Sequence, residues 1–121
     1  MKLRLEDNTL RLRLSGPEVE TFAATGRIAT DTRLGPGPGQ LLSYALERTA
    51  PKIPTPPAGP EAIEADTAGL RYAPGQITVL VPAPLADKWT STSQTGFSAE
   101  IIVSETAKLR ILVEKDLDWH H

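Results

Sequence analysis

The residues of this sequence best suited to chemistry are arginines that alternate with leucine and other aliphatic residues. A guanidinium group binds phosphate or carboxylate through two parallel, charge-assisted hydrogen bonds. Because neighbouring side chains of a strand point to opposite faces, arginines at this spacing share one side of a sheet. We therefore predict an anion-binding sheet face whose candidate ligands are Arg4, Arg11, Arg13, Arg71 and Arg110.

Two glutamates, Glu47 and Glu114, fall on the same predicted face and leave its role open. In one interpretation they neutralise arginines on a hydrated sheet surface, each exposed pair contributing about 0–1 kcal/mol. In another, the strands curl around the face into a barrel with a basic cavity. The leading hypothesis is a non-enzymatic domain that binds a small anionic ligand or a protein partner through this face.

The rival hypothesis is a metal-dependent enzyme that acts on a phosphorylated small molecule. Glu47 and Glu114 would then hold a divalent cation. A third possibility is a structural protein that self-associates through an exposed sheet edge. Oligomeric state stays open at this stage.

The sequence lacks the residues that several kinds of chemistry require. The chain has no cysteine, which excludes disulfides, thiol catalysis and cysteine-type zinc sites. The only histidines, His120 and His121, are expected to form a frayed tail, so neither a general base nor a serine triad is available inside the chain. Neither a Walker loop nor a dinucleotide fingerprint occurs, and we expect no cofactor.

The net charge and the hydropathy of the chain limit the kinds of partner that it is expected to bind. The formal net charge of -2 argues against general nucleic-acid binding. No apolar run approaches the roughly eighteen residues of a membrane span, so no membrane contact is expected. A soluble, cytoplasmic protein is the expectation.

The elements that position the arginines begin with a hairpin. Apolar and polar residues alternate on both sides of Asp7-Asn8, a pair that suits a two-residue turn. This register places Arg4 opposite Arg11 and Lys2 opposite Arg13. Directly opposed like charges destabilise a sheet by up to about 1 kcal/mol per pair, so this face needs water or acidic neighbours.

A helix follows the hairpin. Ser15 or Gly16 suits the cap, Pro17 the first turn, and Gly26 the end after about Thr25. Residues 28–34 and 40–48 are predicted strands, with the GPGPG loop at 35–39 between them. The proline-dense segment at about 50–61 is predicted to be a linker, and residues 63–65 either a short strand or part of it.

Past this segment the pattern repeats at an offset of 67 residues, which aligns Leu3-Arg4 with Leu70-Arg71 and Phe22 with Trp89. The turn Asp7-Asn8 falls on Pro74-Gly75. Thr25-Gly26 matches Thr95-Gly96 only after a three-residue insertion, and the offset then returns to 67. We interpret the chain as a duplicated β-β-α-β-β unit.

These patterns predict a single α+β domain. Its first repeat spans about 1–49 and its second about 62–117. About eight mostly antiparallel strands would form a curved sheet or barrel, and two helices would pack on the apolar face through Val19, Phe22, Leu85 or Ala86, and Trp89. Aromatic residues make up 5% of the chain, so the core must depend on Leu, Ile and Val.

The opening MKLRLEDNTLRLRLSGPEVE, the middle ITVLVPAPLADKW with TGF, and the ending LVEKDL are similar to one family. It is an uncharacterised family of small bacterial proteins, a domain of unknown function. The resemblance covers most of the chain and implies no activity.

At the level of fold, duplicated strand-helix-strand units with a charged inner face resemble the triphosphate-tunnel (CYTH) architecture. That resemblance implies a basic tunnel and acidic metal ligands that act on phosphorylated substrates. The N-terminal Glu-x-Glu-x-Lys signature of those enzymes is absent, because this chain begins Lys2, Leu3, Arg4, Leu5, Glu6. The missing signature counts against metal-dependent phosphohydrolysis.

Overall fold

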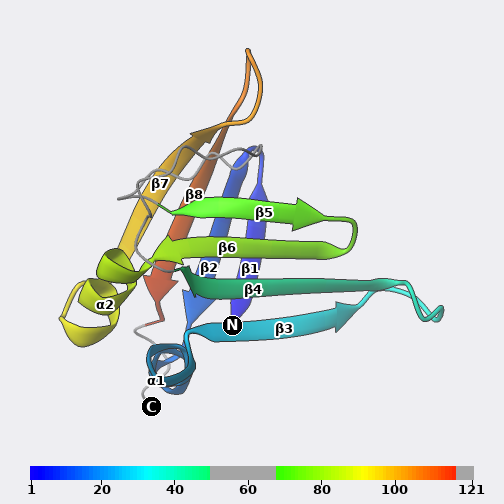
Figure 1. Cartoon of the computed structure of the whole chain (residues 1–121). Coiled ribbons are helices and arrows are strands. Elements are labelled where there is room, and N and C mark those ends of the chain that lie inside the picture. Colours follow the sequence, from blue (N-terminus) through cyan, green and yellow to red (C-terminus); the bar gives the residue numbers. More distant parts are fainter. Residues whose placement is uncertain (50–67, 117–121) are drawn as a thin grey trace.

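The computed structural model describes residues 1–49 and 68–116, which form eight strands and two helices (Figure 1). In chain order they are β1 (Lys2–Glu6), β2 (Thr9–Leu14), α1 (Gly16–Thr25), β3 (Arg27–Arg33), β4 (Leu41–Thr49), β5 (Gly69–Ala73), β6 (Gln76–Pro82), α2 (Ala83–Ser91), β7 (Gly96–Ile102) and β8 (Lys108–Lys115). The predicted linker at about 50–61, the segment 63–65 and both histidines lie outside the described residues.

The strands form two four-stranded sheets. The first sheet has the order β1-β2-β8-β7, and the second sheet has the order β3-β4-β6-β5. Four of the six strand pairings are antiparallel, and the central pairings β2-β8 and β4-β6 are parallel. The strands of the second sheet cross in front of those of the first (Figure 1).

The predicted single curved sheet or closed barrel is therefore wrong. Each sheet ends in two edge strands within the described residues, so neither sheet closes on itself. The alternation along one strand indicates which side is buried, but it carries no information about which other strand lies beside it. The tunnel implied by the triphosphate-tunnel resemblance is likewise absent from the described part of the chain.

The first hairpin has the predicted register. Arg4 lies opposite Arg11, and Lys2 lies opposite Arg13. Asp7 takes a left-handed backbone conformation at φ 52°, which aspartate tolerates better than most residues. In the matching turn of β5 and β6, Gly75 takes φ 77° after Pro74, and glycine carries no steric penalty there.

Helix α1 begins with a capping box. The Ser15 side chain accepts a hydrogen bond from the Glu18 N–H, and the Glu18 carboxylate accepts one from the Ser15 N–H. Partial burial raises the pKa of Glu18, but hydrogen bonds from the N-terminal ammonium group and Ser15 outweigh it and lower the pKa overall. Gly26 ends the helix at φ 81°, as predicted.

Replacing Ser15 with alanine should lower the free energy of unfolding by about 1 kcal/mol, because the substitution leaves an N–H group of the first helical turn without its acceptor. Urea denaturation measures the change. Thr21→Ala is the control, because Thr21 lies exposed on the same helix and its hydroxyl, within the described residues, bonds only to the carbonyl of Pro17. Equal losses in the two variants would contradict the capping role.

The two helices meet through their aromatic anchors. Phe22 of α1 and Trp89 of α2 are in edge-to-face contact, with ring centroids 6.1 Å apart. Arg48 at the end of β4 holds α2 by two hydrogen bonds to Asp87, of 3.0 and 2.9 Å. This pairing lowers the pKa of Asp87 and raises that of Arg48. Figure 1 shows both helices side by side at one corner of the molecule.

The core lies between the two sheets. The predicted apolar face of each sheet is the buried one, with Leu12 and Val113 from the first sheet and Leu46 and Val79 from the second. We expected the helices to cover these faces, but each sheet mainly covers the other. The helices close one end of the core with the buried side chains of Val19, Phe22, Ala86 and Trp89. The two sheets can enclose the core between them because the inner face of each sheet is mainly aliphatic.

Each sheet combines one hairpin from each half of the chain. In the first sheet Leu12 lies beside Val113. In the second, Val79 lies beside Leu46, and these are the positions that the 67-residue offset assigns. Two backbone hydrogen bonds also correspond. The Arg48 N–H donates to the Gly26 carbonyl, and the Lys115 N–H donates to the Thr95 carbonyl. Gly26 and Thr95 are 95 - 26 = 69 positions apart, two more than the offset of 67, whereas the predicted match of Thr25-Gly26 with Thr95-Gly96 uses three more.

Within the described ranges, neither helix has the length and apolar character needed to cross a membrane.

Candidate functional site

The predicted polar face exists, but it is divided between two surfaces. The apolar sides of the sheets enclose the core, so each sheet turns its polar side outward. The first sheet carries Arg4, Arg11, Arg13 and Arg110, and the second sheet carries Arg71. The structure therefore does not bring the five candidate arginines into one space.

Three of these arginines share a groove on the outer face of the first sheet. This cationic groove is lined by Lys2, Leu3, Arg4, Arg11 and Arg13 and has a volume of about 420 Å³. Strands β1 and β2 build it, because their register sets Lys2 against Arg13 and Arg4 against Arg11. Lys2 was not among the predicted ligands, although the same register already placed it there.

Carboxylates balance only part of this charge. Lys2 lies 3.3 Å from Asp116, and Arg4 lies 3.1 Å from Glu6. The Arg11 Nε lies 3.0 Å from Glu114 Oε1, at an angle that does not make a hydrogen bond. The Arg13 Nε atom is buried without a hydrogen-bond partner, and Arg13 makes no ion pair within residues 1–49 and 68–116.

Comparison with known families gives a single family model that matches residues 1–119, a range that includes every residue of this surface. The chain belongs to the family of unknown function DUF7009. This result confirms the resemblance to an uncharacterised family. Neither the comparison with curated proteins nor that with solved structures gives a match, so the triphosphate-tunnel resemblance has no support from them.

The other predicted site residues of this DUF7009 chain lie apart from the groove. Arg110 lines a separate hollow of about 390 Å³ on the first sheet with Ser98, Ala99 and Glu100. Arg71 of the second sheet bonds to Glu47 at 3.3 and 3.4 Å.

Glu47 and Glu114, the predicted metal ligands of the rival hypothesis, lie on different sheets. Each is already in contact with arginine: Glu47 with Arg27 and Arg71, and Glu114 with Arg11. In the described part of the chain no three His, Cys, Asp or Glu side chains gather in a way that would hold a metal ion.

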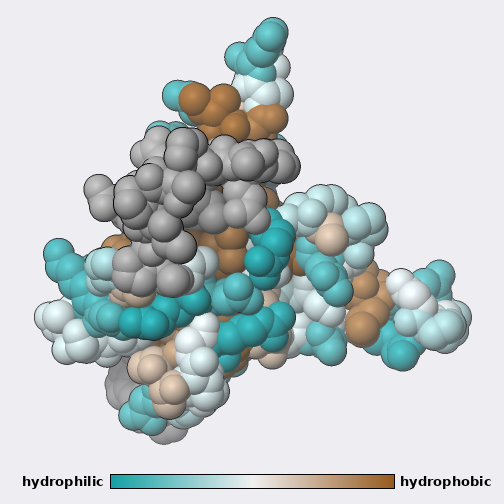
Figure 2. All heavy atoms as spheres, in the orientation of Figure 1, coloured by the Kyte–Doolittle hydropathy of each residue, from teal (hydrophilic) through white to brown (hydrophobic). Residues whose placement is uncertain are grey.

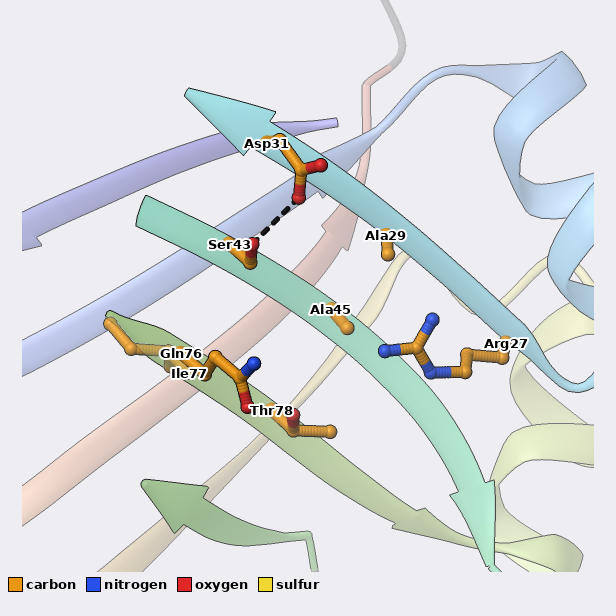
Figure 3. Close-up of a pocket in the computed structure, with 8 residues that line it drawn as sticks. All are labelled: Arg27, Ala29, Asp31, Ser43, Ala45, Gln76, Ile77 and Thr78. Atoms are coloured by element: carbon orange, nitrogen blue, oxygen red, sulfur yellow. Dashed lines mark hydrogen bonds between the residues drawn. The ribbon is translucent and has the colours of Figure 1, made fainter. Parts of the chain in front are cut away.

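The second sheet has a hollow of its own, which sequence reasoning missed. It has a volume of about 270 Å³ and lies on the outer face across β3, β4 and β6 (Figure 3). Its polar lining comes from Arg27, Asp31, Ser43, Gln76 and Thr78. The alternation in β3 could have indicated part of this hollow, since Arg27, Ala29 and Asp31 lie on one face of the strand. The sequence did not indicate that β6, which is distant in the chain, lies in the same sheet.

Apolar side chains gather elsewhere on the surface. In Figure 2 hydrophilic residues spread across the centre of the face turned to the viewer, and apolar ones gather at the projecting hairpin ends. The exposed large apolar side chains there include Leu34 after β3 and Ile102 at the end of β7.

Proposed function

We propose that the cationic groove binds a small anion that carries phosphate or carboxylate groups. The observation that supports this most directly is Arg13, a half-buried guanidinium whose Nε has no acceptor in the described structure. A buried donor without a partner costs about 1–3 kcal/mol. A bound anion would supply the missing acceptor.

The charge arrangement supports the same proposal. Lys2 and Arg13 are directly opposed, as are Arg4 and Arg11, and such pairs repel each other. An anion lying over these four side chains would reduce the repulsion while accepting hydrogen bonds from several donors at once. Among these cations, Arg13 has the fewest competing contacts and is therefore the ligand on which affinity should depend most.

The dimensions favour a small ligand over an acidic protein surface. A groove of about 420 Å³ falls within the usual range for small-molecule sites, about 300–1,000 Å³. We infer a binding role rather than a catalytic one, because Glu114, the carboxylate nearest these arginines, is paired with Arg11. The candidate ligands are therefore compact molecules with two or more negative groups.

We also propose an internal duplication of the chain, which the matched registers of β2-β8 and β6-β4 support. The offset of 67 residues relates Lys2, Arg4, Arg11 and Arg13 to Gly69, Arg71, Thr78 and Leu80. Only Arg71 keeps a positive charge, and Leu80, which replaces Arg13, is 2% exposed. We infer that anion binding belongs to the first sheet alone.

Titration calorimetry at low salt tests the proposal, with tripolyphosphate and citrate as probes. We expect the wild-type chain to bind at least one of them, and Arg13→Gln to weaken binding about tenfold or more, since a hydrogen bond to a charged group contributes about 1.5–3 kcal/mol. Raising the salt concentration should weaken binding further.

Arg71→Gln is the matched control, because it removes the same charge from the second sheet. It should leave the affinity unchanged. Absence of binding to both probes, or equal weakening by the two variants, would refute the groove as an anion site.

A further inference from the structure

The hollow on the second sheet carries two charged groups with unused bonding capacity. Arg27 bonds to Glu47 through Nε at 3.3 Å, and within the described residues its two terminal nitrogens make no hydrogen bond. Asp31 accepts a hydrogen bond from the Ser43 hydroxyl at 2.7 Å through Oδ1. Its Oδ2 has no partner in the described ranges, and no cation is paired with this carboxylate there.

The two groups lie at opposite ends of a floor of small side chains. Arg27 and Asp31 are on the same face of β3, separated by Ala29. Ala29 lies directly opposite Ala45, which in turn lies beside Thr78 of β6. In Figure 3 the Arg27 guanidinium extends inward over the sheet toward Ala45, and the Asp31–Ser43 pair stands at the other end.

We propose that this hollow binds a small zwitterion, with the carboxylate of the ligand on Arg27 and its ammonium group on Asp31. A guanidinium with two free N–H-bearing nitrogens suits a carboxylate, and a carboxylate with a free oxygen suits an ammonium group. Gln76 and Thr78 would provide neutral hydrogen bonds between the charged ends. The methyl groups of Ala29 and Ala45 would contact the carbon chain of the ligand.

The spacing selects the kind of zwitterion. Four residues of extended strand cover about 13 Å, and only the Arg27 side chain reaches inward across that span. The charged ends of the ligand must then stand several bonds apart, as in a dipeptide or an ω-amino acid, and not on one carbon as in an α-amino acid. Sugars and nucleobases fit less well, since no aromatic ring lines the hollow for stacking.

This proposal is independent of the cationic groove, because the two sites lie on different sheets that turn their polar faces in different directions. They also differ in charge. The groove is lined by four cations and one leucine, whereas the hollow contains one cation and one carboxylate.

Titration of the ¹⁵N-labelled chain, followed by amide chemical shifts, tests the proposal with glycylglycine and 6-aminohexanoate as probes. We expect saturable shifts at the amides of Ala29, Ser43, Ala45 and Thr78. Arg27→Gln and Asp31→Asn should each weaken binding about tenfold, because each removes one charge-assisted contact. Ala29→Leu should abolish binding by filling the floor, and its exposed position on an edge strand makes the substitution tolerable for folding.

Glu100→Gln is the matched control, since Glu100 of β7 occupies the place in the first sheet that Asp31 occupies in the second. It should leave the affinity unchanged. Acetate and propylammonium, each with one charged end, should bind at least tenfold more weakly than either zwitterion. Absence of saturable shifts, equal binding of the single-charge probes, or unchanged affinity in Ala29→Leu would overturn the proposal.

Discussion

Replacing Trp89 with alanine is expected to lower the free energy of unfolding by about 3–5 kcal/mol. Trp89 is 0% exposed and lies where the two helices and the first sheet meet. Its ring makes edge-to-face contacts with Phe22, at 6.1 Å between centroids, and with Phe97, at 5.4 Å. The indole N–H also donates a hydrogen bond to the Thr95 carbonyl at 3.3 Å. Alanine would leave a large cavity and remove all of these contacts.

Urea denaturation monitored by circular dichroism measures this loss. Tyr72→Ala is the control, because Tyr72 is also aromatic but is 69% exposed, and its substitution should change stability by no more than about 0.5 kcal/mol. A typical domain is stable by about 5–15 kcal/mol, so Trp89→Ala removes a large share of the total stability. Trp89→Phe keeps part of the packing and should show an intermediate loss. A Trp89→Ala chain as stable as Tyr72→Ala would contradict the central position of this residue.

Replacing Leu12 with alanine is expected to cost about 2–5 kcal/mol. Leu12 is 1% exposed on the central strand β2, with Leu3 opposite it on one side and Val113 beside it on the other. The substitution removes aliphatic contacts within the sheet and toward the second sheet. It leaves a cavity that the rigid strand pairing cannot close.

Leu5→Ala provides the matched control in the same hairpin. Leu5 has the same chemistry and the same inward parity as Leu12, but it is 60% exposed near the end of β1. Its substitution should cost no more than about 0.5 kcal/mol. Equal losses for Leu5→Ala and Leu12→Ala in thermal or urea denaturation would show that the core is not where the structure places it.

Strand β2 connects these stability effects to the proposed function. Leu10, Leu12 and Leu14 of β2 are buried in the core, while Arg11 and Arg13 point into the cationic groove. Substitutions at the arginines therefore leave the core side of β2 unchanged. This separation makes a loss of anion affinity in Arg13→Gln interpretable as a loss of ligand contacts, once its melting temperature matches that of the wild type.

Sequence reasoning succeeded where structure depends on neighbouring residues. The hairpin register of β1 and β2 and the helix end at Gly26 follow from local alternation and turn chemistry, and the structure confirms both. Of the two predicted cap positions, Ser15 and Gly16, the structure uses Ser15. The alternation also identified the buried sides of β2 and β8. In β6 the residues Thr78 and Leu80, on the side opposite Val79, are buried as well. The end of the second helix was harder to place, because α2 ends at Ser91 with Thr92 in extended backbone as its cap and lacks the left-handed glycine that ends α1.

Sequence reasoning failed where structure depends on strands far apart in the chain. The pairing of β2 with β8 joins residues about a hundred positions apart, and nothing in either strand specifies that partner. For the candidate site, the sequence brought Arg4, Arg11 and Arg13 together, since one hairpin carries them. Arg71 and Arg110 were grouped with them only because they lie on the polar side of their strands. That position does not indicate which sheet a strand belongs to.

The amino-acid sequence by itself determined the elements, their buried and polar sides, and the β-hairpin that carries the cationic groove, because all of these follow from steric and hydrophobic preferences over a few residues. Only the tertiary structure decided that hairpins from the two halves combine into two separate sheets that cover each other. That outcome depends on which backbone hydrogen-bonding edges meet, and every strand offers similar edges. The same choice separated the arginines into two surfaces and created the hollow that contains Arg27 and Asp31.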